Sequence, residues 1–211
     1  MIARRIALAV GLVVSACVFG CPPAGQNGAA GQSLVKPQWI NLMDESRIKR
    51  WRVIKGTASF DDGVIVLNSG SSADASIMAD GVDLKDGAVE IEMHRRHASR
   101  DDAPITVALR LVPRIDFSSV YIVCRPEQVE ACRSAIFNSQ PGAEFIAKIP
   151  KAERPPEVWR FVMTGGRIDC FRFGQKVLTY ADPNPRHGTI ALTASNCRVL
   201  VSAVRYMPSG N

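Results

Sequence analysis

The sequence predicts an all-β fold of about ten short antiparallel strands, arranged as a sandwich or barrel. Three observations carry this prediction. Apolar and polar residues alternate with a period of two along most of the chain after Trp39. The 16 Gly and 13 Pro residues among 211 supply turn signals between these segments. A composition of 46% hydrophobic and 22% charged residues is that of a globular domain, which excludes collagen-like, coiled-coil and wholly disordered chains.

The individual strands follow from the alternation. The clearest is 88–94, where Val89, Ile91 and Met93 take one face and polar residues the other. In chain order, the predicted strands are 52–54, 58–60, 64–68, 88–94, 105–111, 120–124, 158–163, 167–173, 177–180, 189–194 and 199–206. A hairpin is expected at Asp61-Asp62-Gly63. One short helix is expected over 126–136, where Glu127, Glu130 and Arg133 could share a face.

The first residues have the parts of a secretory signal. Arg4 and Arg5 precede an apolar run, 6–14, which is too short to cross a bilayer. Small residues then lead to Cys17, as in the lipoprotein box where the signal is cut before an acylated Cys. We therefore expect a signal peptide over 1–16, a flexible tether over 17–38 and a β-sandwich domain over 39–207. The alternative is a plain secretory signal.

This leader predicts an extracytoplasmic lipoprotein of the cell envelope, anchored in a lipid membrane through Cys17. The formal net charge is +6, yet no block of Lys and Arg follows that would track a phosphate backbone, so nucleic acid is not an expected partner.

Four cysteines follow the leader, and in an exported chain an even number favours disulfides. Cys124 and Cys132 lie close in sequence across an expected loop, and Cys170 and Cys197 each lie near a predicted strand end. We expect these two pairs, with free buried thiols as the alternative. No pair has the Cys-x-x-Cys spacing of a metal or redox site.

The order of the elements resembles a known family. The segments that carry the likeness are Trp51-Arg52-Val53, Gly63-Val64-Ile65-Val66, Gly87-Ala88-Val89-Glu90-Ile91-Glu92, Leu109-Arg110, Val158-Trp159-Arg160-Phe161, Gly166-Arg167-Ile168-Asp169, Gly174-Gln175-Lys176-Val177 and Gly188-Thr189-Ile190-Ala191-Leu192. Over residues 39–207 this order resembles the 3-keto-disaccharide hydrolase-like domain family, whose members are bacterial extracytoplasmic proteins. The resemblance implies a concanavalin A-like jelly-roll sandwich, related to laminin-G folds, and a carbohydrate ligand.

Polar residues on two predicted strands form the candidate site. Glu90, Glu92 and His94 share the polar side of one strand, and Arg110 has the same place on the next. Carboxylates two residues apart on a strand lie about 6 to 7 Å apart, within the range of an acid and base pair for sugar hydrolysis. If the chain is an enzyme, Glu90 and Glu92 are the candidate acid and base, His94 the proton partner and Arg110 the substrate clamp. The alternative is an ordinary solvated strand face.

No cofactor or metal is expected, because the chain has only three histidines. Trp39, Trp51 and Trp159 are candidates either for stacking on sugar rings or for the core. The sequence therefore predicts a lectin-like protein that binds a carbohydrate and, if catalytic, hydrolyses it. The alternative function is a noncatalytic structural or interaction module of the cell envelope.

Overall fold

The computed structural model describes residues 38–70, 74–96, 103–113, 118–134, 144–151 and 156–209. The predicted signal peptide, Cys17 and nearly all of the predicted tether lie outside these residues. The described elements, in chain order, are β1 (Ile40–Asn41), α1 (Glu45–Ile48), β2 (Trp51–Lys55), β3 (Thr57–Asp61), β4 (Val64–Asn68), β5 (Asp74–Ala79), β6 (Gly87–Arg96), β7 (Ile105–Val112), β8 (Ser118–Cys124), β9 (Gln128–Ser134), β10 (Phe145–Lys148), β11 (Glu157–Thr164), β12 (Arg167–Arg172), β13 (Gln175–Ala181), β14 (Thr189–Ser195) and β15 (Arg198–Pro208).

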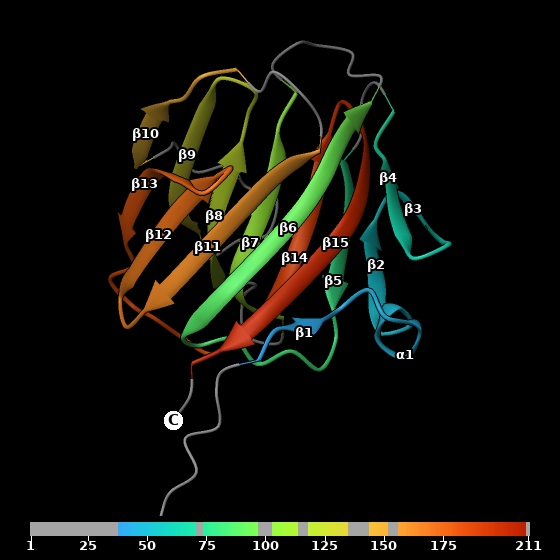
Figure 1. Ribbon diagram of the computed structural model, residues 1–211, viewed down its shortest axis with the longest axis horizontal. Helices are drawn as coiled ribbons and strands as arrows, with labels where there is room; N and C mark the ends of the chain where they lie inside the picture. Colours follow the sequence, from blue (N-terminus) through green and yellow to red (C-terminus); the bar gives the residue numbers. More distant parts are fainter. Residues whose placement is uncertain are drawn as a thin grey trace, which may run out of the picture. The chain divides into compact units, whose positions relative to one another are not determined.

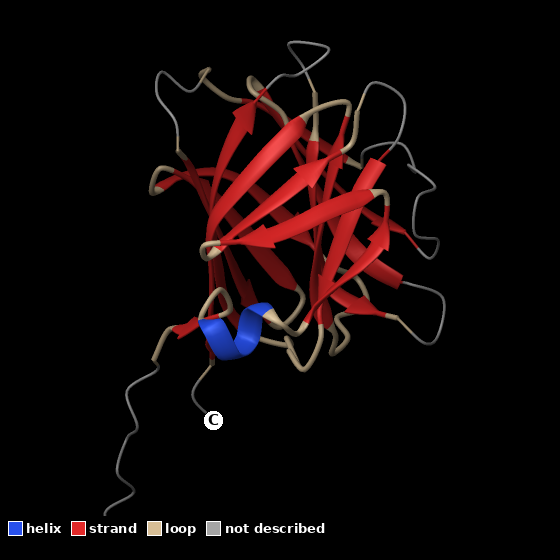
Figure 2. Cartoon of the chain, turned by 90° about the vertical axis from the view of Figure 1, so that its right-hand side faces the viewer, coloured by secondary structure: helices blue, strands red, loops and turns tan. Residues whose placement is uncertain are grey.

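The strands form two antiparallel sheets packed face to face, which confirms the predicted jelly-roll sandwich (Figure 1). The sheet nearer the viewer in Figure 1, here called the front sheet, has the order β13-β12-β11-β6-β15-β4-β3, with β1 paired to β15. The other, the back sheet, has the order β10-β9-β8-β7-β14-β5-β2. The only described helix, α1, is short and lies at one end of the strands (Figure 2).

Turn chemistry sets the register of the hairpin between β3 and β4. Asp62 and Gly63 both have positive φ, 44° and 73°, the backbone of a tight turn whose twist matches that of the strands. The turn places Asp61 opposite Val64 and Thr57 opposite Asn68. The predicted Asp61-Asp62-Gly63 hairpin is therefore confirmed.

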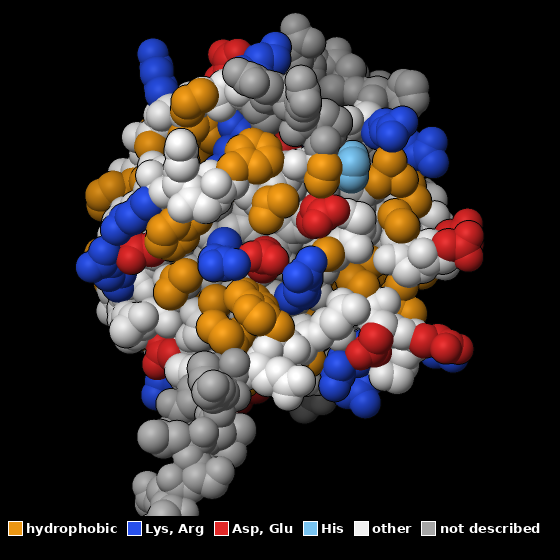
Figure 3. Space-filling model, in the orientation of Figure 1, with side chains coloured by type: hydrophobic (Ala, Val, Ile, Leu, Met, Phe, Trp, Pro, Cys, Tyr) orange, Lys and Arg blue, Asp and Glu red, His pale blue; other side chains and the backbone are white. Residues whose placement is uncertain are grey.

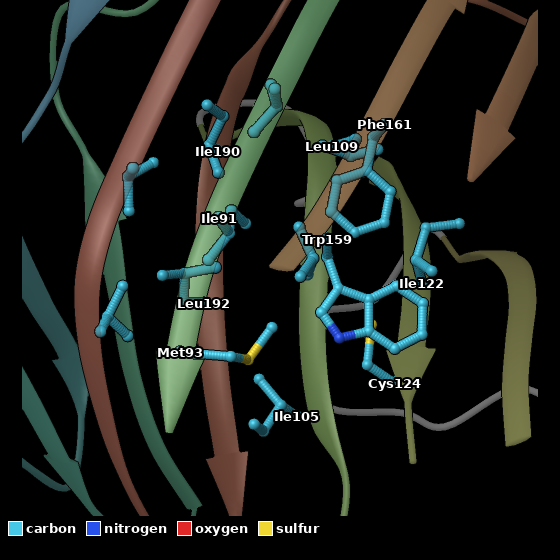
Figure 4. Packing of buried hydrophobic residues seen from close by; sticks show 14 of the residues in the cluster. Ile91, Met93, Ile105, Leu109, Ile122, Cys124, Trp159, Phe161, Ile190 and Leu192 are labelled. Carbon is cyan, nitrogen blue, oxygen red and sulfur yellow. The ribbon is translucent and has the colours of Figure 1, made fainter. Parts of the chain in front are cut away.

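The core lies between the sheets and uses the apolar side of each alternating strand (Figure 4). From the front sheet, Ile91 and Met93 of β6 and Trp159 and Phe161 of β11 are almost fully buried. Leu109, Ile122, Ile190 and Leu192 of the back sheet face them. The period of two thus fixes which side of each front-sheet strand remains outside.

A buried ionic cluster joins the two sheets at one end of the sandwich. Arg95, near the end of β6, donates to Glu157 Oε1 at 2.8 Å and to the carbonyl of Cys124 at 2.9 Å. Arg172 of β12 donates to Glu157 Oε2 at 2.9 Å, and its guanidinium lies 5.4 Å from the centre of the Trp159 ring. The predicted alternation places Arg172 on the core side, and these partners compensate the burial of its charge.

The expected helix over 126–136 is wrong. In the structure β8 ends at Cys124, and β9 begins at Gln128 and pairs with it in antiparallel register. Val129 and Ala131 are fully buried, so the segment follows a period of two. The spacing of Glu127, Glu130 and Arg133 is compatible with a helix. The segment forms a strand instead because it pairs with β8 and buries Val129 and Ala131 in the core.

Candidate functional site

β6 carries the predicted site residues on the outer face of the front sheet. Val89, Ile91 and Met93 are buried in the core, so Glu90, Glu92 and His94 project to the opposite side and are only partly exposed. Their spacing along an extended strand separates successive members by about 6 to 7 Å. The structure therefore brings these three side chains together on one strand face, as the sequence predicted.

Two neighbouring strands supply arginines to Glu90. Arg160 of β11 and Arg205 of β15 stand directly opposite Glu90 in the two ladders. Glu90 Oε2 accepts from Arg160 Nε at 3.0 Å and from Arg160 Nη2 at 2.6 Å. Arg205 Nη1 lies 3.7 Å from Glu90 Oε1. Both carboxylate oxygens are therefore engaged by guanidinium groups.

Trp39 completes this group of residues. It directly precedes β1, which pairs with β15 at Arg205 and Tyr206. The Arg160 guanidinium lies 5.4 Å from the centre of the Trp39 ring, a cation–π distance. Trp39 is only partly buried, whereas Trp51 and Trp159 belong to the core. We call Trp39, Glu90, Arg160 and Arg205 the Glu90 cluster.

Glu92 and His94 are less constrained. Glu92 Oε1 accepts from the Ser202 hydroxyl at 2.9 Å, beside a bulge in the pairing of β15 with β6. His94 stands opposite Leu200, and no hydrogen bond or ion pair joins it to another residue of the described ranges. Neither residue contacts the Glu90 cluster through a hydrogen bond that the structure shows. The strand face thus holds one tightly paired carboxylate and one that a hydroxyl engages.

Arg110 is not part of this face, contrary to the expectation. It belongs to β7 in the back sheet, and its φ of 57° lies in a β-bulge that breaks the period of two. The side chain is fully buried and donates to Asp182 Oδ2 at 3.0 Å and to the carbonyls of Lys85 at 2.8 Å and Gly165 at 2.7 Å. Arg110 therefore links the back sheet to the edge of the front sheet, and it lies too deep to clamp a substrate.

The outer face of the front sheet is mixed in character. Figure 3 shows hydrophobic side chains interspersed with charged ones across the face in view. Phe171 stands opposite Arg160, and Val158 stands opposite Glu92; both are partly exposed. Planar charged groups beside an aromatic ring and aliphatic side chains can contact the hydroxyls and the apolar faces of a sugar at the same time. This arrangement suits binding better than proton transfer.

Other hollows in the described part of the chain lie away from this face. A groove of about 690 Å³ runs beside the turn between β8 and β9 and is lined by Arg125, Pro126, Glu127, Gln128, Glu130, Lys148 and Lys151. Arg125 is paired there with Glu130 at 2.7 Å. Two smaller hollows, of about 210 and 290 Å³, flank the turn after β5. None of the three contains Glu90, Glu92 or His94.

The expected disulfides are not formed. Cys124, Cys132, Cys170 and Cys197 are all described, and all four are buried free thiols. Cys124 faces the core, whereas Cys132 packs with Met78 and Tyr121 in a separate apolar cluster. Cys170 lies on β12 and Cys197 precedes β15, with β11 and β6 between them, so about 14 Å of sheet separates the strands. Neither pair therefore has the geometry that a disulfide requires.

Burial also sets the chemistry of these thiols. It raises the pKa of Cys170 to about 12 and that of Cys132 to about 11. Within the described ranges there is no cluster of three or more His, Cys, Asp or Glu residues that could hold a metal ion. In the same ranges, no helix has the length and apolar character needed to cross a membrane.

Comparisons with known proteins find this architecture in several solved structures. No protein-family model matches the chain, and no curated protein sequence matches it. Among solved structures, the carbohydrate-binding module CBM66 from Bacillus subtilis is similar with a TM-score of 0.62 and 12% identity, covering 74% of this chain and 95% of that one. The potassium-bound carbohydrate recognition domain of Emp46p has a TM-score of 0.62 and 10% identity, covering 82% of this chain and 96% of the other.

A structure described as a native glycosidic hydrolase is also similar, with a TM-score of 0.59 and 14% identity over 82% of this chain and 96% of that one. At these identities the likeness shows the fold alone. The fold is that of lectin-like and glycosidase β-sandwiches, in agreement with the concanavalin A-like architecture expected from the sequence.

Proposed function

We propose that this protein binds a carbohydrate on the outer face of its front sheet, at the Glu90 cluster. The observation that carries the proposal is the geometry of that cluster: a partly exposed Trp39 ring beside Arg160, which Glu90 holds through two hydrogen bonds of 3.0 and 2.6 Å. A pre-positioned guanidinium offers paired donors to vicinal hydroxyls, and the ring offers an apolar surface. The carbohydrate-binding proteins among the similar folds support this assignment.

Binding without hydrolysis fits the geometry best. An acid and base pair needs carboxyl groups that can reach the glycosidic oxygen and a water molecule. Both oxygens of Glu90 are engaged by Arg160 and Arg205, and one oxygen of Glu92 is engaged by Ser202. Arg110, the expected substrate clamp, is buried elsewhere. The noncatalytic module is therefore the function that we place first.

Hydrolysis is the second candidate, and it rests on the resemblance to the 3-keto-disaccharide hydrolase-like family together with one feature of the site. His94 lies next but one to Glu92 on the same strand face, and within the described residues it has no hydrogen-bond partner. If the protein is a hydrolase, Glu92 and His94 exchange a proton with substrate or water, and Glu90 positions the sugar through Arg160.

We also propose that the protein acts in the cell envelope as a lipoprotein. Acylation of the Cys17 thiol and cleavage after residue 16 would leave a lipid-bearing first residue, and residues 17–38 would tether the sandwich to the membrane. Metabolic labelling with a palmitate analogue tests this directly: the parent chain should be labelled, and Cys17→Ser should not. Labelling that survives this substitution would contradict the assignment.

The binding proposal is tested by a screen of immobilised polysaccharides. Trp39→Ala and Arg160→Gln should each weaken binding about tenfold, because each removes one of the two surfaces offered to the sugar. Arg52→Gln is the matched control, since Arg52 is an exposed arginine on β2 of the back sheet. Absence of binding by the parent, or equal binding by parent and both variants, would refute the proposal.

An assay for newly formed reducing ends separates the two candidates. A noncatalytic module leaves the bound polysaccharide intact. Release of reducing ends by the parent chain, abolished in Glu92→Gln and retained in Arg52→Gln, would establish the hydrolase instead.

A further inference from the structure

The outer face of the front sheet carries more positive than negative side chains. On its four adjoining strands β12, β11, β6 and β15, five arginines project outward against three carboxylates. The arginines are Arg96, Arg160, Arg167, Arg198 and Arg205, and the carboxylates are Glu90, Glu92 and Asp169. The excess positive charge lies on the same face as the Glu90 cluster.

Two of the three carboxylates of this face are paired with cationic side chains, and the third, Glu92, accepts from the Ser202 hydroxyl. Glu90 binds Arg160 and Arg205. Asp169 binds Arg167 at 3.0 Å and Lys176 at 2.9 Å. Every outward arginine of the four strands is thereby paired except two, Arg96 and Arg198. Both are exposed, and neither forms an ion pair with a residue of the described ranges.

The two unpaired arginines face each other. Arg96 ends β6 and Arg198 begins β15, and the ladder places them directly opposite. Opposed residues of an antiparallel pair have Cα atoms about 4.5 to 5.5 Å apart, so two like charges at such a pair repel. Asn68, exposed on β4, stands on the other side of Arg198. The arrangement concentrates hydrogen-bond donors at one place on the surface. We call Arg96 and Arg198 the Arg96 pair.

We propose that the Arg96 pair binds an acidic group of the ligand, so that the carbohydrate of this protein is an acidic polysaccharide bearing carboxylate or sulfate groups. This inference rests on the proposed function. An anion between two guanidiniums relieves their repulsion and accepts several charge-assisted hydrogen bonds. Arg96 lies six positions along extended β6 from Glu90, a span of about 20 Å. A ligand that reaches both points is therefore an extended chain of sugar units and not a single sugar.

The test uses four probes: polygalacturonate for carboxylate, dextran sulfate for sulfate, uncharged dextran, and phosphatidylglycerol vesicles for an anionic lipid surface. The full chain with Cys17→Ser is the reference, so that the predicted acyl anchor does not report on vesicle binding. The test variant is Arg96→Gln with Arg198→Gln. The control is Arg52→Gln with Lys148→Gln, which makes the same change of charge at exposed sites on the back sheet.

The test variant should bind at least one of the two acidic polysaccharides about tenfold more weakly than the reference, whereas the control should stay within about twofold. Added salt should weaken the binding of the reference more than that of the test variant. The test variant should also unfold at a slightly higher temperature without ligand, because a like-charge pair has been removed. If the double substitution weakens binding of polygalacturonate, the acidic group is a carboxylate; if it weakens binding of dextran sulfate, the group is a sulfate.

Several results would overturn the inference. Equal loss in the test and control variants would mean that overall charge alone draws the polymer. Binding to vesicles but to neither acidic polysaccharide would assign the pair to lipid. If dextran binds as tightly as the acidic polymers and depends on Trp39, only this inference fails. If no polysaccharide binds, the proposed function fails with it.

Discussion

Replacing Arg110 with Met is expected to destabilise the sandwich strongly and to leave carbohydrate binding by the folded protein unchanged. Arg110 is fully buried and donates to Asp182, to Asp86 and to the carbonyls of Lys85 and Gly165. Met has a similar length and fills much of the same space, so the change removes the charge and the donors while keeping most of the packing.

The magnitude follows from what the substitution leaves behind. Asp182 is itself fully buried and, among the described residues, would keep only Arg133, at 2.5 Å, as a charged partner. The carbonyls of Lys85 and Gly165 would lose the Arg110 donor. Breaking a buried pair by removing one partner costs about 3 to 5 kcal/mol. In a domain of this size, 1 kcal/mol shifts the melting temperature by about 2 to 4 °C, so a drop of about 6 to 20 °C is expected.

Thermal and urea unfolding, followed by circular dichroism, measure this effect. Arg52→Met is the matched control, because Arg52 is exposed and lies 3.6 Å from an exposed Asp80. Such a surface pair contributes below about 1 kcal/mol. If Arg110→Met costs no more than Arg52→Met, the buried cluster does not hold the sheets together. If Arg110→Met unfolds at the same temperature as the parent but no longer binds carbohydrate, Arg110 is the substrate clamp.

Three further predictions concern the core and the surface. The four cysteines should resist a thiol reagent in the native chain and react in urea, since burial raises the pKa of Cys170 to about 12; fast native reaction or a disulfide in the mass spectrum would contradict this. Trp159→Ala should cost about 3 to 5 kcal/mol in urea unfolding, and a loss below about 1 kcal/mol would disprove its place in the core. Burial raises the pKa of Asp169, but hydrogen bonds from Thr179, Lys176 and Arg167 outweigh it and bring the pKa to about 2. Because that value lies below the usual 3.8, the ionised carboxylate stabilises the folded state above pH 3.8, and this stability is lost as the pH falls through about 2. The free energy of unfolding of Asp169→Asn should therefore fall less across this pH window than that of the parent. Parallel curves of unfolding free energy against pH for the two proteins would refute this.

The alternation of residues predicts the fold because it is a local property that burial enforces. On β6 each second residue must face the other sheet, so the exposed side of Glu90, Glu92 and His94 follows from the sequence alone. The pattern fails where a bulge interrupts it. Arg110 has a positive φ in such a bulge, and nothing in the surrounding residues 105–111 marks the break.

The partners of the site could not be predicted, because they depend on which strands are neighbours. Arg160 and Arg205 are 70 and 115 positions away from Glu90, and only the sheet order brings β11 and β15 to either side of β6. The prediction of the two disulfides was wrong for the same reason. Closeness in sequence suggested Cys124 with Cys132, but the two lie on opposite faces of one hairpin.

Amide hydrogen exchange, with and without the polysaccharide that binds best in the screen, tests the central claim most directly. A ligand on the outer face of the front sheet should slow exchange in β6, β11 and β15 around Glu90, Arg160 and Arg205, and leave the β8–β9 turn beside Arg125 unchanged. Protection confined to that turn, or to the back sheet, would show that the carbohydrate binds elsewhere.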